Sequence, residues 1–177
     1  MHPLEVEEAL KTLTVLVDTR EQSTAALSRR LAKFPRHQRE TLNAGDYTGK
    51  LLINGGWHTL PVAIERKMSI DELCNCYCKQ RPRFEREFNR ARDANIKMYL
   101  LVEGASWEYI YSDMYQSHMR PRSLVGSILS WLSRYDCQIL MCKSSTTGQL
   151  IWDILYYEAR TYLLRMVVDE QQEQISR

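Results

Sequence analysis

The apolar positions of the chain follow two different periods. Short, continuous apolar runs at residues 14–17, 98–102 and 138–142 are typical of buried strands, whereas apolar residues three or four apart are typical of helices packed on a core. Two extended segments are expected around the turn residues 54–56. Helices are predicted after an N-cap at Ser23, over 69–79, around Phe84 and Phe88, over 124–135 and over 148–168. This alternation predicts an α/β domain with a mixed central sheet flanked by helices.

Length and composition are those of one ordinary folded domain. The chain has 177 residues, so we expect residues 1–177 to form a single domain, with a core that bears the motifs at about 14–104 and a helical part at about 105–177. Every apolar run is far shorter than the ~20 residues that cross a bilayer, and the acidic N-terminus is unlike a secretory signal. The 5 cysteines, an odd number, fit no closed set of disulfides. We therefore expect no membrane association and no secretion, and a reducing compartment such as the cytoplasm or nucleus.

The net charge of +2 says little, but its distribution is informative. Basic residues cluster in segment 28–39, which holds no acid, and in segment 79–92, where Glu85 and Glu87 are the acids. Each segment is either a phosphate-binding surface or the solvated face of a helix. If the second segment binds DNA, its arginines should contact phosphates rather than bases. The expected contacts are Arg81, Arg83, Arg86 and Arg90.

The expected hairpin brings two acidic residues together. A turn at Gly55-Gly56 places Asp46 directly opposite Glu65, with Cβ atoms about 4.5–5.5 Å apart. A turn at Asn54-Gly55 makes the same two residues diagonal neighbours, and a bulge at the proline of the second strand would also change the register. In both registers Asp46, Glu65 and Lys67 share one face, which is mostly polar. The opposite, apolar face comprises Tyr47, Leu51, Ile53, Leu60, Val62 and Ile64.

Two carboxylates this close need something to offset their repulsion, which is about 4 kcal/mol at 4 Å and an effective dielectric of 20. A proton, a lysine or a divalent cation would do so, and oxygen ligands beside a lysine suit Mg²⁺ or Mn²⁺ rather than zinc. A cation held in this way can activate water and neutralise charge on a phosphate, while Lys67 could orient that water or stabilise the transition state. The alternative is an exposed hairpin face with ordinary ion pairs.

Further acids are expected near the same edge of the sheet. Asp18 ends the first buried strand, where α/β sheets present functional groups, and Arg20 and Glu21 follow it closely. A capping box at residues 69–72 places Asp71 in the first turn of the next helix. Asp71 is therefore either part of the acidic site or a carboxylate favoured by the helix dipole alone.

Three segments taken together carry a family resemblance. They are Val17-Asp18-Thr19-Arg20-Glu21, Gly45-Asp46-Tyr47 and Ile64-Glu65-Arg66-Lys67-Met68-Ser69-Ile70-Asp71-Glu72-Leu73. This ordered set resembles the nuclease domain of the XPF-type structure-specific endonucleases. The family signature is GD, a variable gap, and then ERK with an aspartate four residues after the lysine. Its fold is restriction-endonuclease-like, of the PD-(D/E)xK type.

The resemblance implies a metal-dependent endonuclease that hydrolyses phosphodiester bonds in branched or junction DNA, during repair, recombination or phage DNA processing. By matching position, Asp46 and Glu65 would be the main ligands of Mg²⁺ or Mn²⁺, with Asp18 as a third, and Lys67 would be the catalytic lysine. Arg20 and Arg66 match motif arginines that could hold the scissile or an adjacent phosphate. The implied acidic cluster is Asp18, Glu21, Asp46, Glu65 and Asp71.

Two other functions remain open: a catalytically idle nuclease-fold module that binds DNA or a protein partner, and an interaction subunit that uses its long C-terminal helix. The apolar surface of that helix exceeds one packing face, since it extends to Trp152, Tyr156 and Leu164. We therefore expect a homodimer built on this helix. The cysteines at 74, 76 and 78 do not predict a zinc site, because a helix turns the middle thiol away from the other two.

Overall fold

The centre of the structure is a mixed sheet of seven strands. The strands are β1 (Thr14–Asp18), β2 (His37–Glu40), β3 (Tyr47–Ile53), β4 (Gly56–Thr59), β5 (Val62–Lys67), β6 (Lys97–Glu103) and β7 (Gln138–Cys142). Their order is β2-β1-β3-β5-β6-β7, with β4 paired to β3, in a computed structural model that describes residues 3–175. β1 is parallel to β2, and β5 to β7 are parallel to one another, whereas β3 is antiparallel to its neighbours. The expected α/β class with a mixed central sheet is confirmed.

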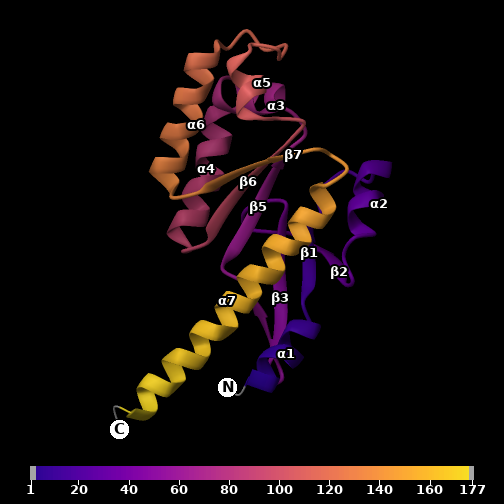
Figure 1. The fold of residues 1–177 in the computed structure, drawn as a ribbon, viewed down its shortest axis with the longest axis vertical. Coiled ribbons are helices and arrows are strands. Elements are labelled where there is room, and N and C mark those ends of the chain that lie inside the picture. The colour runs from indigo at the N-terminus through magenta and orange to yellow at the C-terminus, as the bar shows by residue number, and fades with distance from the viewer. Residues whose placement is uncertain (1–2, 176–177) are drawn as a thin grey trace.

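Helices cover both faces of this sheet (Figure 1). One layer comprises α1 (Pro3–Lys11), α2 (Ala25–Leu31) and α7 (Thr147–Ile175). The other comprises α3 (Ile70–Tyr77), α4 (Arg81–Asp93), α5 (Trp107–Tyr111) and α6 (Pro121–Tyr135). Successive residues of β6 enter the two cores in turn, because strand side chains alternate between faces: Leu100 packs with α3 to α6, and Leu101 packs with the other layer.

Aromatic packing fixes α4 between the sheet and α6. Phe84 of α4 stacks on Trp131 of α6, with ring centroids 4.8 Å apart and an interplanar angle of 14°. Phe88, one turn further along α4, meets the same Trp131 edge-on at 5.4 Å. Both phenylalanines are buried, and such pairs contribute about 0.5–1.5 kcal/mol each beyond the area they bury. The basic segment 79–92 therefore lies on a helix whose orientation is firmly set.

The hairpin register differs at its tip from the preferred prediction. Ile53 pairs with Gly56, so the turn is Asn54-Gly55, and the prediction of a turn at Gly55-Gly56 is wrong. Both turn residues have positive φ, 50° and 79°, which is typical of the tight hairpin turn that Asn-Gly favours. The chain then leaves its pairing between β4 and β5, and the pairing resumes with Tyr47 opposite Ile64. In this register the residues next to that pair, Asp46 and Glu65, lie opposite each other. The predicted apolar face of the hairpin is buried in the core.

Some elements carry no clear signal in the sequence. The predicted elements do not include α1, the edge strand β2, whose residues are all exposed, or the short α5. The cap of α2 is Thr24 rather than Ser23, because the Thr24 hydroxyl accepts the Leu27 N–H at 3.1 Å. Within residues 3–175, no helix combines the length and the apolar character that a membrane span requires.

Candidate active site

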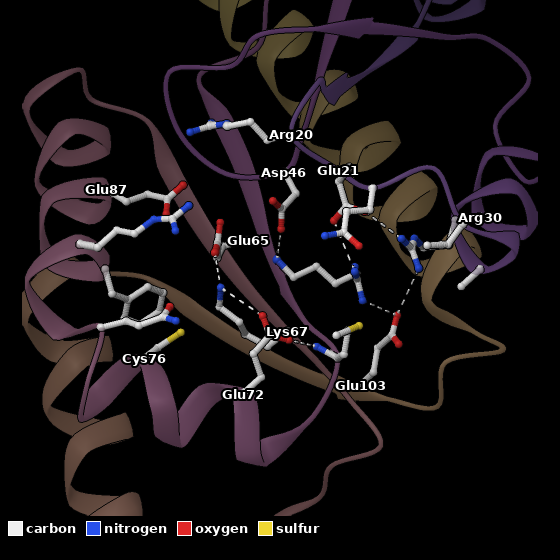
Figure 2. A pocket seen from close by; sticks show the side chains of 18 of the residues that line it. Arg20, Glu21, Arg30, Asp46, Glu65, Lys67, Glu72, Cys76, Glu87 and Glu103 are labelled. Atoms are coloured by element: carbon white, nitrogen blue, oxygen red, sulfur yellow. Dashed lines mark hydrogen bonds and ion pairs between the residues drawn. The ribbon is translucent and has the colours of Figure 1, made fainter.

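A pocket of about 700 Å³ opens beside the end of β5, between the turn that precedes β3 and the helix α4 (Figure 2). Asp46 enters it from the turn, and Glu65 and Lys67 enter it from β5. Acids and arginines from other elements surround these three side chains. The structure thus brings together the two acids and the lysine that the hairpin argument placed on one face.

Asp46 and Glu65 form an acidic pair, in which Glu65 is buried and Asp46 is half-buried. The Asp46 N–H donates to the Ile64 carbonyl at 2.8 Å, and the Arg66 N–H donates to Asp46 Oδ2 at 2.8 Å, so backbone bonds hold this carboxylate in place. Burial raises the pKa of Asp46 to about 6, and the charges of nearby acids add to this shift. Burial and the charge of Asp46 likewise raise the pKa of Glu65 well above its ordinary value. A pair of this kind favours whatever neutralises it, whether protons or a cation.

Lys67 lies against this pair. Its Nζ donates to Glu65 Oε1 at 2.5 Å and lies 5.3 Å from the centroid of the Phe84 ring, which forms the wall of the pocket. Burial alone would lower the pKa of Lys67, but the charges of Glu65 and Asp46 outweigh it and raise this pKa. The lysine is therefore a permanent cation inside the pocket.

Asp18 does not line this pocket. Its Oδ1 accepts the backbone N–H and Nε of Arg20, both at 2.7 Å. Its Oδ2 accepts Arg20 Nη2 at 2.8 Å and the Leu42 N–H at 2.9 Å. Burial would raise the pKa of Asp18, but the bonds from Arg20 and Leu42 lower it. In this structure Asp18 fixes the loop after β1 and aims Arg20, which does line the pocket, and it is not grouped with Asp46 and Glu65 as the expected third ligand.

Asp71 also lies elsewhere. The cap of α3 is as expected, since the Ser69 hydroxyl accepts the Glu72 N–H at 3.2 Å and the Glu72 carboxylate accepts the Met68 N–H at 2.7 Å. Asp71, however, accepts the Ser117 N–H at 2.6 Å and does not line the pocket. In this structure it anchors the loop between α5 and α6 and is not grouped with the acids of the pocket.

A network of two acids and two arginines closes one end of the pocket (Figure 2). Glu21 accepts Arg30 Nη2 at 3.0 Å and Arg66 Nη2 at 3.4 Å. Glu103 Oε1 lies 3.4 Å from Arg66 and 3.9 Å from Arg30. All four side chains are at most 9% exposed. Arg66 is therefore held by two carboxylates, and it is a much less available phosphate contact than its place in the motif implies.

Sequence reasoning did not select Arg30 or Glu103 as site residues. Arg30 lies in the basic segment 28–39, which we read only as a surface, yet its side chain turns inward and also donates to the Tyr47 hydroxyl at 3.0 Å. Glu103 ends β6 as Asp18 ends β1, at the edge of the sheet where functional groups gather. That shared position is the signal that could have identified Glu103.

The expected DNA-contacting arginines of α4 divide into two groups. Arg83, Arg86 and Arg90 line the pocket. Arg81 instead pairs with Glu85 at 3.0 Å and lines a separate hollow against α6, so its predicted place beside the others is corrected. Glu87 is a further pocket residue that the sequence offered only as a counter-charge.

The residues of the pocket suit a hard divalent cation, although they supply few ligands. Asp46 and Glu65 each keep one carboxylate oxygen, Oδ1 and Oε2, that accepts no hydrogen bond from the described residues. Oxygen donors of this type fit Mg²⁺ or Mn²⁺. In the part of the chain that the structure describes, no three or more His, Cys, Asp or Glu side chains are grouped so as to hold a metal ion. A cation here would depend on these two carboxylates together with water and substrate oxygens.

The cysteines do not change this assignment. All five thiols are free, and Cys74 and Cys76 are buried whereas Cys78 is exposed. Cys76 lines the pocket beside Lys67, away from the other two.

Comparison with known proteins identifies the family. The ERCC4 domain matches residues 17–152. XPF from Aeropyrum pernix is 22% identical, with a TM-score of 0.58 over 92% of this chain and 71% of that one. The same protein in complex with DNA is 20% identical, with a TM-score of 0.57 over 86% of this chain and 66% of the other. A search of the curated proteins finds no match. Because the domain match spans most of the sequence and the fold agrees, the chain belongs to the ERCC4 family and is an XPF-type nuclease domain.

Proposed function

We propose that this protein is a metal-dependent DNA endonuclease that hydrolyses phosphodiester bonds, with branched or junction DNA as its substrate. One observation carries the proposal: the half-buried Asp46 and the buried Glu65 form an acidic pair beside the charged Lys67, in a pocket lined by arginines. Perturbed acids beside a fixed lysine are the arrangement expected of a catalytic centre. The proposal also retains three expectations from the sequence. They are a reducing compartment, a role in DNA repair, recombination or phage DNA processing, and a homodimer.

Asp46 and Glu65 are the residues that would hold Mg²⁺ or Mn²⁺. When bound, such a cation supplies positive charge to a phosphate under attack and lowers the pKa of a water. The contribution of Asp46 is an aligned carboxylate, because the Arg66 N–H and the Ile64 carbonyl fix its position. The contribution of Glu65 is a second carboxylate that already shares its charge with Lys67.

The cationic side chains perform the remaining tasks. Lys67 presents a permanent positive charge to the reacting phosphate and stabilises the charge that develops on its oxygens. Arg20, which Asp18 aims and whose side chain is 53% exposed, lies at the rim and binds an adjacent phosphate. Arg83, Arg86 and Arg90 guide the backbone of the strand into the pocket.

Two observations support DNA as the substrate. The first is the row of pocket-lining arginines on α4, because phosphate contacts dominate binding to nucleic acids. The second is the fold shared with XPF from Aeropyrum pernix, which has been solved in complex with DNA. Branched DNA follows from the family signature and is the finer part of the proposal.

The experiment is a cleavage assay on a forked duplex, a nicked duplex and a linear duplex of the same sequence, with Mg²⁺ or with excess EDTA. We expect Mg²⁺-dependent cutting of the fork, and losses of about two orders of magnitude or more in Asp46→Asn and Glu65→Gln, whose shapes are conserved while ligand charge is removed. Both variants should still bind the fork. Cutting in EDTA, or wild-type cutting by Asp46→Asn, would falsify the cation site. Equal cutting of all three DNAs would refute the preference for branches.

A further inference from the structure

Glu87 connects the arginine-bearing helix to the turn that presents Asp46. Its Oε1 accepts the Gly45 N–H at 3.0 Å, and Gly45 immediately precedes Asp46. Figure 2 shows the Glu87 side chain reaching from α4 into the pocket that holds Asp46 and Glu65. Glu85, two residues earlier on the same helix, lines neither this pocket nor its mouth and pairs instead with Arg81 and Arg134.

The turn needs this support from the helix side. Gly45 is buried and has φ +69°, and a Cβ there would lie 3.0 Å from the Ile64 carbonyl oxygen. Its N–H therefore has little access to water, and a buried N–H without an acceptor is costly. On the sheet side, Asp46 is held by two backbone bonds, to the Ile64 carbonyl at 2.8 Å and from the Asp18 N–H at 2.9 Å. Glu87 supplies the bond from the opposite side.

A carboxylate is a costly choice for this bond, and the cost indicates a second role. A glutamine would accept the same N–H without charge. The Glu87 carboxylate instead brings a third negative charge into the pocket that Asp46 and Glu65 line. Lys67 and the arginines of the pocket offset part of this repulsion, and a bound cation would offset more of it, so the charge of Glu87 favours the binding of a cation.

We propose that Glu87 is a positioning residue for the divalent cation: its hydrogen bond fixes the Gly45–Asp46 turn, and its charge strengthens cation binding by Asp46 and Glu65. This inference rests on the proposed function. It also explains why one helix carries both the arginines of the pocket and the anchor of the turn. The helix α4, whose arginines contact the DNA backbone in this proposal, thereby also fixes the position of Asp46 relative to that backbone.

The test compares Glu87→Gln with Glu85→Gln, the same change two residues away on the same helix. Mn²⁺ affinity is measured by titration calorimetry without DNA, and thermal unfolding is measured without metal. Glu87→Gln should bind Mn²⁺ about tenfold more weakly, as is typical when a residue that supports a ligand is changed. Its metal-free melting temperature should rise by about 2 °C or more, because one of three crowded charges is gone. Glu85→Gln should bind Mn²⁺ as the wild type does.

Glu87→Ala separates the bond from the charge. It removes both, so its Mn²⁺ affinity should fall below that of Glu87→Gln, and its metal-free protein should gain no stability. On forked DNA, Glu87→Gln should lower kcat at saturating DNA while KM for DNA stays unchanged. Wild-type Mn²⁺ affinity in Glu87→Gln, or an equal loss in Glu85→Gln, overturns the role of the charge. Identical behaviour of Glu87→Ala and Glu87→Gln overturns the role of the bond. A wild-type protein that binds no Mn²⁺, either alone or with a forked DNA that cannot be cleaved, overturns the proposed function itself.

Discussion

Lys67 and Glu65, two residues apart on β5, form a buried ion pair in which Nζ lies 2.5 Å from Oε1 and neither side chain is more than 10% exposed. A strand sends such residues to the same face, so the pair is a direct result of the ERK spacing. Removing one member of a buried ion pair costs about 3–5 kcal/mol, because the other charge is left without its partner. The lysine therefore contributes to folding as well as to the chemistry proposed for it.

The substitution Lys67→Ala separates these two contributions. We expect cleavage to fall by about two orders of magnitude or more, and the free energy of unfolding to fall by about 3 kcal/mol in the absence of metal. The double variant Glu65→Gln/Lys67→Met, measured by urea denaturation, should recover much of that stability and no activity. Full stability in Lys67→Ala would show that the pair contributes nothing to the fold.

The raised pKa of Asp46 predicts that the stability of the metal-free protein depends on pH. Its pKa in the folded protein, about 6, lies above its ordinary value of 3.8, so between these values the folded state binds the proton more tightly than the unfolded chain. The free energy of unfolding should therefore fall as pH rises from about 4 through about 6, by at most about 3 kcal/mol from this group. Asp46→Asn should lose this component in melting curves taken at pH 5 and pH 8. The same slope in both proteins would contradict the assignment.

Asp18 should behave as a structural residue. Asp18→Asn removes the charge from four hydrogen bonds, two of which come from the Arg20 side chain, so we expect a loss of stability of about 2 kcal/mol. Mn²⁺ affinity measured by calorimetry should stay within about twofold of the wild type, because Asp18 lies outside the pocket. A larger fall in Mn²⁺ affinity with no loss of stability would restore Asp18 as a ligand.

The arginines of α4 should differ in their effect on DNA binding. Substituting Arg83 and Arg86 by glutamine should reduce the slope of log affinity against log salt by about two units at most, whatever the DNA sequence. Substituting Arg81 and Arg134, which pair with Glu85, is the matched control and should leave the slope nearly unchanged. Fluorescence anisotropy over a salt series measures both. Equal slopes for the two double variants would remove the distinction between the two sides of the helix.

The exposed apolar side chains of the C-terminal helix α7 predict a homodimer. Leu155 and Leu163 are fully buried against the core, while on the other side Tyr157 is 64% exposed and Leu164 is 43% exposed. We expect a two-fold dimer that covers this second apolar side. Sedimentation equilibrium should show a dimer at tens of micromolar, and Tyr157→Glu/Leu164→Glu should convert it to a monomer of unchanged fold. A monomeric wild type at that concentration would end this proposal.

The parts of the site that could be predicted are those that depend on strand periodicity. Asp46, Glu65 and Lys67 share a face in either register, so uncertainty about the turn did not affect their grouping. The parts that could not be predicted depend on how helices pack. Arg30 turns inward because α2 lies against the sheet beside Glu21, and Glu87 reaches Gly45 because the aromatic stack sets the rotation of α4. For Asp18, the strand end was predictable and Arg20 lies only two residues away, but the Leu42 N–H comes from a loop that is distant in the sequence and reaches Asp18 only in the folded chain.

Because pairing is interrupted between β4 and β5, residues can be inserted at the tip of the hairpin. β4 pairs with β3 alone, whereas the opposed positions of Asp46 and Glu65 are set by the separate pairing of Tyr47 with Ile64. Residues added in pairs at Asn54-Gly55 would extend both arms of the hairpin without moving the carboxylates. The hairpin tip can therefore accept insertions, or a grafted peptide, while Asp46 and Glu65 stay opposite each other.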